Sequence, residues 1–352
     1  MAAFIGACVA CAQGMHFLHN VIYNSNRLIG LSPPREPRSR MSNCCFFEER
    51  VRTMKKHFLT LAVTTLLAGS VFAESNDTIA KAKASGSITM GVRDSSGALS
   101  YTLGDGKYVG FHVEICQNII ANLEKAVGKK LEVKYTPVTS QNRIPLTENG
   151  TVDIECGSTT NNEARQKQVA FAFTTYVEEV RIAVRANSGI SAIGQLNGKN
   201  VATTTGTTSV QLLRKNERAT GVDFKEVFGK DHADSFLLLE SGRADAFVMD
   251  GQILAGNIAN SKAPADFKIV GEVLNVEPIA IMFRKDDPAF KKLADDTIAG
   301  LAKSGELAKL YDKWFVQAIP PKNIKLGLVA SEATKAAWAN LNDKPVEAYA
   351  KK

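Results

Sequence analysis

Short apolar runs alternate with longer amphipathic stretches through most of the chain after residue 87. The run "ITMGVR" (88–93) predicts a buried strand, and "FHVEICQNIIANLEKAV" (111–127) repeats apolar residues about every four positions, as an amphipathic helix does. The following segments predict a strand at "LEVKYTPV", a short helix at "QNRIPLTEN" and a strand at "VDIEC". Strands that alternate with helices are typical of parallel sheets covered on both faces.

A weak internal repeat suggests that this arrangement occurs twice. "LTENGTVDIECG" (146–157) and "LESGRADAFVMD" (239–250) each contain a helix end, a glycine suited to a left-handed conformation and a strand. "EPIAIMFRKDD" (277–287) predicts one late strand, and two amphipathic helices are expected after it. We therefore expect two α/β lobes joined by crossing strands, with residues 74–180 in the first lobe, 181–275 in the second and 276–352 back in the first.

Polar residues fall where such a fold binds ligands. Small ligands occupy clefts between domains, and in open α/β sheets they lie off the carboxyl ends of strands beside helix N-termini. Glu178 and Glu179, in contrast, are expected on a solvated part of a crossing strand. The polar residues at predicted strand ends are Arg93, Ser158 to Thr160, Thr207, Thr208 and Asp250.

Composition changes this picture little. With 352 residues, 45% of them apolar and 22% charged, the chain is long enough for two globular domains and is not disordered by composition. Residues 1–73 carry eight Lys and Arg against three Glu, so they hold +5 of the formal net charge of +7. The remaining +2 on residues 74–352 does not indicate a nucleic-acid-binding protein.

The N-terminal region predicts export. From Met54 the chain reads "MKKHFLTLAVTTLLAGSVFAES", with two lysines, an apolar run and small residues before Ala73. This pattern is typical of a signal peptide (54–73) cleaved after Ala73, and the run is shorter than the about 20 residues of a membrane span. A buried N-terminal helix is the alternative. Residues 1–53 are interpreted as a non-native extension from a start assigned too early.

Two cysteines, Cys116 and Cys156, remain after Ala73. In an oxidising compartment they can pair, but the sequence does not show whether their Cα atoms come within about 6 Å. An unpaired buried thiol at each position is the equal alternative.

Several long motifs carry a family resemblance from about Ser85 to Asn323. In order they are "TSQNRIPL", "ECGSTTNNEARQKQ", "GTTS", "KDHADSF", "ESGRADAFVMDG", "MFRKDDPAFKKL" and "DKWF". The chain resembles the periplasmic solute-binding proteins of polar amino acid ABC transporters, in particular those for glutamate and aspartate. The resemblance implies a type II periplasmic binding fold, a periplasmic monomer without cofactor, metal or nucleic acid, and a permease in the inner membrane as partner.

The same resemblance implies the ligand contacts. The first lobe would offer most of them, and closure about the crossing strands would add three from the second lobe. A planar guanidinium group can hold a carboxylate in a bidentate fork. The α-carboxylate would meet Thr160, Arg165 and Thr208; the α-ammonium, Ser158 and Asp250; and the second carboxylate, Arg93, Ser140, Arg143 and His232.

This set predicts selectivity for dicarboxylic amino acids. Three Arg and one Asp give about +2 with His neutral, against −1 for glutamate or aspartate. A neutral ligand would leave Arg93 and Arg143 buried without partners, at about 3–5 kcal/mol for a broken buried pair. Glutamine and asparagine should therefore bind more weakly.

Each residue also has a simpler interpretation. Arg143 and Arg165 would, like most arginines in such helices, be solvated or in surface ion pairs. His232 could be a helix cap or a surface imidazole, the threonines of "GTTS" could be helix caps, and Asp250 could cap a helix starting at Gly251. The chain also departs from its family, because relatives pair the cysteine of "ECGSTTNN" with one on the late strand. "EPIAIMF" has none, so Cys116 would replace that partner only where geometry allows.

Two other classes of function stay open. The same fold resembles a cyclohexadienyl dehydratase, for which Glu155, His232 or Asp250 would be the general acid. A sensor ectodomain would need a membrane span or signalling module, and the sequence shows neither after Glu74. No nucleophile with a base at a recognisable spacing is present, so we expect a binding protein and not an enzyme.

Overall fold

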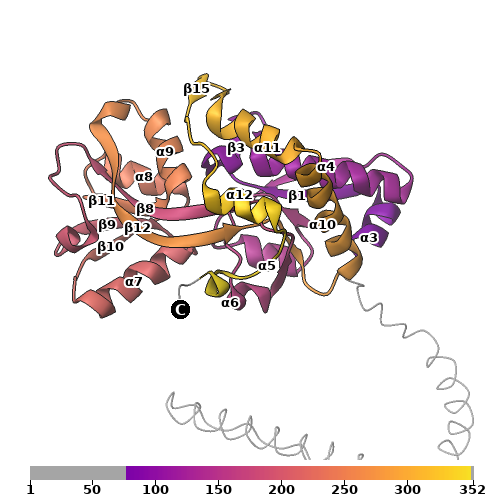
Figure 1. Cartoon of the computed structure of the whole chain (residues 1–352), viewed down its shortest axis with the longest axis horizontal. Coiled ribbons are helices and arrows are strands. Elements are labelled where there is room, and N and C mark those ends of the chain that lie inside the picture. Colours follow the sequence, from indigo (N-terminus) through magenta and orange to yellow (C-terminus); the bar gives the residue numbers. More distant parts are fainter. Residues whose placement is uncertain (1–76, 350–352) are drawn as a thin grey trace, which may run out of the picture. The chain divides into compact units, whose positions relative to one another are not determined.

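A computed structural model of the chain describes residues 77–349. The predicted extension (1–53) and the predicted signal peptide (54–73) lie outside the described residues. Within 77–349 the chain builds two five-stranded sheets, each with helices packed against it (Figure 1).

The first lobe is organised around a sheet of order β5-β1-β6-β13-β7. β1 pairs in parallel with β5 and β6, whereas β13 is antiparallel to β6 and β7. The expectation of purely parallel sheets was therefore wrong, because a late segment returns into this sheet in the opposite direction. Its strands are β1 (Ser87–Val92), β5 (Glu132–Pro137), β6 (Ile154–Glu155), β7 (Val169–Phe171) and β13 (Met282–Arg284).

Helices cover the two faces of this sheet unequally. The larger core contains the apolar stripe predicted for 111–127, whose members Phe111, Ile115, Ile119 and Leu123 are fully buried. α4 begins after Gly110 and ends at Gly128, whose left-handed backbone closes the helix. The helices of this core are α3 (Thr78–Ser85), α4 (Phe111–Val127), α10 (Pro288–Lys303) and α11 (Glu306–Tyr311), while α5 (Arg143–Glu148) and α6 (Glu163–Gln166) contact strands β13 and β7.

The second lobe has a sheet of order β10-β9-β11-β8-β12. β9 is parallel to β10 and β11, and β8 is antiparallel to β11 and β12. α7 (Thr208–Thr220) contributes to the core on one face, and α8 (His232–Glu240) and α9 (Gly251–Asn260) to the core on the other. Its strands are β8 (Tyr176–Arg185), β9 (Asn200–Thr204), β10 (Lys225–Gly229), β11 (Ala246–Asp250) and β12 (Phe267–Ile279).

Two long strands, β8 and β12, run side by side between the lobes (Figure 1). Tyr176 and Ile279 pack in the first core, whereas Val180 and Val270 pack in the second. The single strand predicted at 277–287 was wrong, because β12 ends at Ile279 and β13 begins at Met282 in the other sheet. The apolar run within 277–287 thus contributes the end of β12 to one sheet and β13 to the other.

The C-terminal segment packs against the start of β8. In α12 (Glu332–Ala339), the Thr334 hydroxyl accepts from the Val177 N–H at 3.1 Å, and the Trp338 indole N–H donates to the Thr175 carbonyl at 2.8 Å. The smaller elements are η1 (Gly97–Leu99), β2 (Ser95–Ser96), β3 (Ser100–Gly104), β4 (Lys107–Val109), η2 (Ile193–Leu196), η3 (Pro264–Asp266), η4 (Asp312–Val316), β14 (Ala318–Ile319), β15 (Ile324–Lys325) and η5 (Val346–Ala348).

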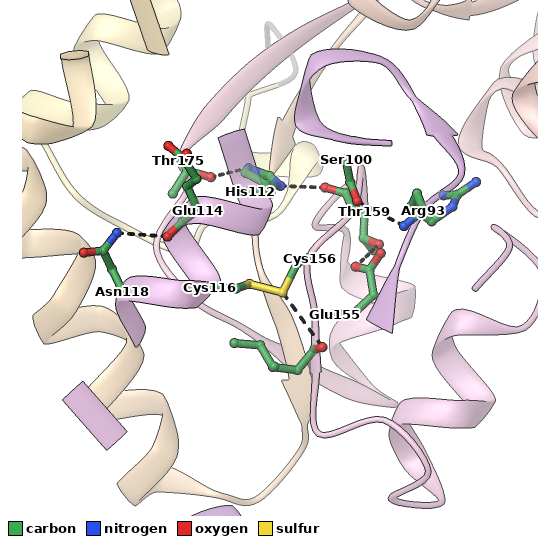
Figure 2. The surroundings of a disulfide bond; sticks show 12 residues. Arg93, Ser100, His112, Glu114, Cys116, Asn118, Glu155, Cys156, Thr159 and Thr175 are labelled. Carbon is green, nitrogen blue, oxygen red and sulfur yellow. Dashed lines mark hydrogen bonds between the residues drawn. A yellow bond between two sulfur atoms is a disulfide. The ribbon is translucent and has the colours of Figure 1, made fainter. Parts of the chain in front are cut away.

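A disulfide joins Cys116 on α4 to Cys156 just after β6, with Cα atoms 6.3 Å apart (Figure 2). The sequence left open whether these cysteines are paired or are two separate buried thiols, and the structure shows that they are paired. His112, one turn earlier on α4, contacts the Gly157 carbonyl through Nδ1 at 2.5 Å and the Thr175 hydroxyl through Nε2 at 2.7 Å. α4 therefore fixes the loop that leaves β6.

Removing the disulfide should destabilise the fold without changing its topology. The bond closes a loop of 40 residues, which corresponds to about 3–4 kcal/mol of lost denatured-state entropy. We expect the double variant Cys116→Ala/Cys156→Ala to lose about that much free energy of unfolding in urea titrations followed by circular dichroism. Reductant should shift the wild-type midpoint and leave that of the variant unchanged. A wild-type midpoint insensitive to reductant would contradict the bond.

Candidate functional site

A small pocket lies where the first-lobe loops meet the helix N-termini of the second lobe. Its cavity volume is about 10 Å³, roughly the space of one water molecule and far below the about 300–1,000 Å³ of sites for drug-sized ligands. Its lining residues are Ser140, Arg143, Ser158, Thr160, Thr207, Thr208, His232, Met249 and Asp250.

Seven of the nine ligand contacts implied by the resemblance line this pocket, and Arg93 and Arg165 do not. The first-lobe members come from the segments that follow β5 and β6. In the second lobe, Thr208 and His232 are the first residues of α7 and α8, and Asp250 ends β11. Segments far apart in the sequence thus bring hydroxyl, guanidinium, imidazole and carboxyl groups together.

Arg143 is the guanidinium group that lines the pocket. Its residue is 2% exposed, and its Nε and Nη1 atoms are buried without a hydrogen-bond partner within residues 77–349. Burial, reinforced by Arg165 and Arg93, lowers the pKa of Arg143 to about 9, so the group is still a cation at neutral pH. A buried cation without a partner is strongly unfavourable, so this position favours an anionic ligand group.

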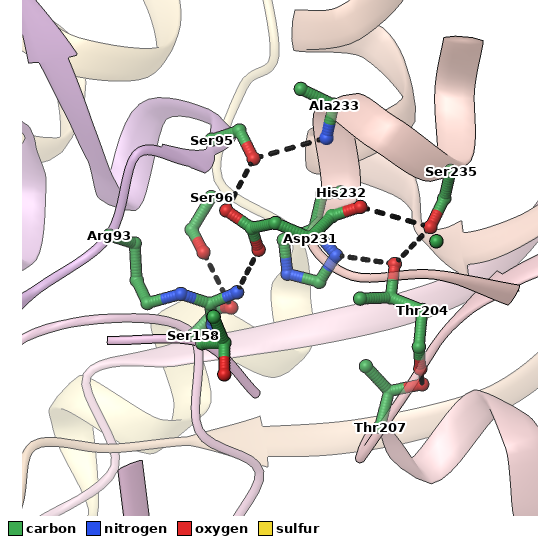
Figure 3. A network of polar contacts seen from close by, with 12 residues as sticks. Arg93, Ser95, Ser96, Ser158, Thr204, Thr207, Asp231, His232, Ala233 and Ser235 are labelled. Carbon is green, nitrogen blue, oxygen red and sulfur yellow. Dashed lines mark hydrogen bonds and ion pairs between the residues drawn. The ribbon is translucent and has the colours of Figure 1, made fainter. Parts of the chain in front are cut away.

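Arg93 is fully buried and joins the two lobes. Its Nη2 atom lies 2.5 Å from the Asp231 carboxylate of the second lobe, which also accepts from the Ser95 hydroxyl at 2.9 Å (Figure 3). Burial alone would raise the pKa of Asp231, but Arg93 and His232 outweigh it and lower that pKa to about 2. Asp231 stands in the motif "KDHADSF" just before His232, but sequence reasoning did not single it out, because its partner Arg93 lies on the other lobe.

Arg165 and the two threonines meet a carboxylate of the protein. The Glu277 side chain, on β12, accepts from the Thr160 hydroxyl at 2.6 Å and from the Thr208 hydroxyl at 2.8 Å. Arg165 donates to the Thr160 carbonyl at 2.8 Å and to the Gly206 carbonyl at 3.4 Å. Glu277 therefore links hydroxyls of both lobes, a role that the sequence did not indicate.

Gly206 permits the close approach of the lobes beside the pocket. Its φ is +82°, and a Cβ atom there would lie 2.8 Å from backbone atoms of Ser140 and Gln141. A side chain at this position would push the second-lobe loop away from the first-lobe loop. The glycine of "GTTS" is thus required by packing between the lobes.

His232 and Asp250 have unusual environments. His232 is 1% exposed, with Nδ1 3.0 Å from the Thr204 hydroxyl and Nε2 buried without a partner in residues 77–349, so the alternative of a surface imidazole was wrong. Burial and Arg93 lower the pKa of His232 to about 3, which keeps the ring neutral. Burial and Glu277 raise the pKa of Asp250 to about 7, against the opposing effect of Arg143. Asp250 precedes α9, but its side chain makes no capping hydrogen bond.

Two sequence-based statements about charge need correction. Glu178 is 2% exposed and not solvated, whereas Glu179 does reach solvent. The count of about +2 was wrong as well, because it omitted four carboxyl groups around the three guanidinium groups. With all groups ionised the formal charge would be −2, so the positions of the charges decide what can bind. The omitted residues are Glu155, Glu178, Asp231 and Glu277, all interacting with the site arginines or with Asp250.

Residues 88–317 match the model of the bacterial extracellular solute-binding proteins, family 3. The chain belongs to this family. Family 3 was thus recognised correctly from the motifs, and the fold class of two α/β lobes joined by two crossing strands is confirmed. A mutant of the arginine-binding protein ArgBP from T. maritima, a solved structure, has a TM-score of 0.60 at 28% identity, covering 67% of this chain and 98% of that one.

Two family 3 relatives are similar over most of the chain. The glutamate/aspartate import solute-binding protein of Escherichia coli K12 is 43% identical over 287 residues, which cover 81% of this chain and 95% of that protein. The L-glutamate/L-aspartate-binding protein of Pseudomonas aeruginosa is 44% identical over 292 residues, which cover 82% and 96%. Between residues 77 and 349, no helix combines the length and apolarity needed to cross a bilayer, and no three His, Cys, Asp or Glu side chains are grouped to hold a metal ion.

The buried His232 should make the fold sensitive to acid. Its pKa of about 3 lies below the unfolded value near 6.5, so between these pH values the unfolded chain binds a proton that the native protein does not. Stability is therefore lost as the pH falls through this window. In His232→Gln the slope of unfolding free energy against pH between 4 and 6 should decrease by about one proton, or about 1.4 kcal/mol per pH unit.

Urea titrations at several pH values measure this slope. Leu237→Gln, which adds the same amide at a 48% exposed position of α8, is the matched control and should keep the wild-type slope. Equal slopes in His232→Gln and wild type would show that the imidazole titrates normally in the folded protein.

Proposed function

We propose that this protein is the substrate-binding component of an ABC importer, and that it binds glutamate or aspartate between its lobes in the periplasm. The observation that carries the proposal is the guanidinium group of Arg143, which lines the pocket while two of its nitrogens lack a hydrogen-bond partner among the described residues. Two relatives that are 43% and 44% identical, a glutamate/aspartate import solute-binding protein and an L-glutamate/L-aspartate-binding protein, support the same ligand class.

The two ends of an α-amino acid match two ends of the pocket. Thr160, Thr208 and the adjacent Arg165 would hold the α-carboxylate, with Thr hydroxyls turning from Glu277 to the ligand. Asp250 and Ser158 would hold the α-ammonium. Both groups are present in every α-amino acid, so these contacts would select α-amino acids in general and would not distinguish one amino acid from another.

The second carboxylate would lie against Arg143, with Ser140, His232 and Arg93 around it. The Ser140 hydroxyl and His232 Nε2 are buried without partners among the described residues, which leaves both for a ligand. In the tautomer whose Nδ1 accepts from Thr204, a neutral His232 carries its proton on Nε2 and would donate it to a carboxylate.

Closure would couple binding to recognition by the permease. We propose residues 74–180 and 276–352 as the first lobe and 181–275 as the second, turning about β8 and β12. Contacts that exist only when the lobes meet, such as Arg93 with Asp231, stabilise the closed form, and a ligand held by both lobes adds to them. The closed monomer would then dock on the permease without any cofactor.

We infer that the protein is not an enzyme, and a direct titration tests this together with the ligand. The purified protein is titrated calorimetrically with glutamate, aspartate, glutamine and prephenate, and the prephenate sample is analysed for products. Glutamate or aspartate should bind near micromolar Kd, about −8 kcal/mol, with glutamine far weaker. Equal affinity for glutamine, or conversion of prephenate, would overturn the proposal.

Arg143→Ala should remove most of the affinity for dicarboxylic amino acids. Losing one partner of a buried charge pair costs about 3–5 kcal/mol, so the Kd for glutamate should rise at least about 100-fold. The Kd of Arg143→Lys for glutamate should lie between those of wild type and Arg143→Ala, because an ammonium group keeps the charge and loses the bidentate geometry. Arg214→Ala, on the exposed side of α7 and paired with Glu226, is the control and should bind like wild type. An unchanged Kd in Arg143→Ala would remove the basis of the second-carboxylate assignment.

A further inference from the structure

Three carboxyl groups lie on adjacent strands at the pocket, and one of them, Asp250, lines it. β8 runs between β11 and β12, and Glu178 on β8 stands opposite Glu277 on β12. Asp250 on β11 stands opposite Val180, two residues after Glu178. Residues two apart on a strand share a face, so all three carboxyl groups lie on one face of the sheet. Their exposures are 2%, 5% and 0% for Glu178, Asp250 and Glu277.

The three groups differ in their partners. Glu277 is satisfied by the hydroxyls of Thr160 and Thr208 and by the Asn275 amide at 2.9 Å. Glu178 accepts from the Glu179 N–H at 2.9 Å through Oε1, but its Oε2 is buried without a hydrogen-bond partner within residues 77–349. A buried carboxylate oxygen without a donor is unfavourable, and a proton on that oxygen relieves the charge.

The surroundings of Glu178 favour such a proton. The groups that interact with it are the carboxyls of Asp250 and Glu277, the phenols of Tyr176 and Tyr311, and the N–H groups of Glu179 and Gln252. Burial and Asp250 raise the pKa of Glu178 well above its usual range. Burial also raises the pKa of Asp250, but the three arginines partly offset this rise. Because the three carboxyl groups belong to one sheet, their spacing does not depend on closure.

We propose that Glu178 and Asp250 share a proton in the protein without solute, and that an ammonium group entering the pocket beside Asp250 displaces it. In the exchange, the O–H bond of the carboxyl breaks, the proton passes to the buffer, and the ammonium pairs with the carboxylate that remains. Glu178 is then a positioning residue that acts through Asp250. Because two adjacent carboxyl groups need one positive charge between them, either the shared proton or an ammonium group of the solute must be present. This inference rests on the proposed function, which places the α-ammonium at Asp250.

Proton release is measured by titrating the protein with glutamate at pH 7 in phosphate and in Tris, whose ionisation enthalpies differ. The dependence of binding enthalpy on buffer gives the number of protons released, which should lie between about a half and one for wild type. Affinity should weaken as the pH falls toward 5, by up to about tenfold per pH unit.

Glu178→Gln should release far fewer protons, below about a quarter, and should bind with a flatter pH profile, because an amide neither carries this proton nor repels Asp250. Glu179→Gln is the matched control, since its side chain is 47% exposed on the opposite face of β8 and pairs with Arg181. It should release as many protons as wild type.

Glutarate, which has both carboxylates and no ammonium, tests the idea without a mutation if Glu178→Gln fails to fold. It should bind without the proton release that glutamate shows. Buffer-independent enthalpy for glutamate in wild type, equal release in Glu178→Gln, or equal release by glutarate would each overturn the inference. Failure of every amino acid to bind would instead overturn the proposed function.

Discussion

The Arg143 guanidinium group lies between the two lobes, almost fully withdrawn from water and without an ion pair among the described residues. Taking a cation out of water is favourable only where opposite charge and hydrogen-bond acceptors replace the lost hydration. Glu155 and Asp250 act on the charge of Arg143, but neither forms an ion pair or hydrogen bond with it among the described residues. The pocket chemistry follows from this one unsatisfied cation.

The electrostatic character of the pocket depends more on where the charged groups lie than on their total charge. Five carboxyl groups surround three guanidinium groups, yet each carboxyl group has a distinct environment. Arg93 keeps the pKa of Asp231 low, whereas burial and Asp250 raise the pKa of Glu178, and burial and Glu277 raise the pKa of Asp250. In the complex that we propose, an acidic group would lie at the Arg143 end and a cationic group at the Asp250 end, although the formal total is negative.

The framework holds these groups through a few long-range links. The disulfide and His112 tie the loop after β6 to α4, and the C-terminal helix α12 binds the start of β8. Gly206 lets the second lobe approach the loop that carries Ser140. Each link lies on a segment that carries a site residue or adjoins one, so the rigid part of the fold extends to the edge of the pocket.

The sequence by itself determined the strands and helices of the lobes, because the spacing and the length of an apolar run show which of its residues are buried. The stripe on 111–127 and the polar residues at strand ends, including Arg93 and Asp250, were visible in this way. Family motifs identified the remaining contacts. Tertiary structure alone decided that Cys116 pairs with Cys156, that Glu178 is buried, and that Asp231 and Glu277 take up Arg93 and the threonines. These depend on distances between residues as much as 138 positions apart, and no local pattern encodes them.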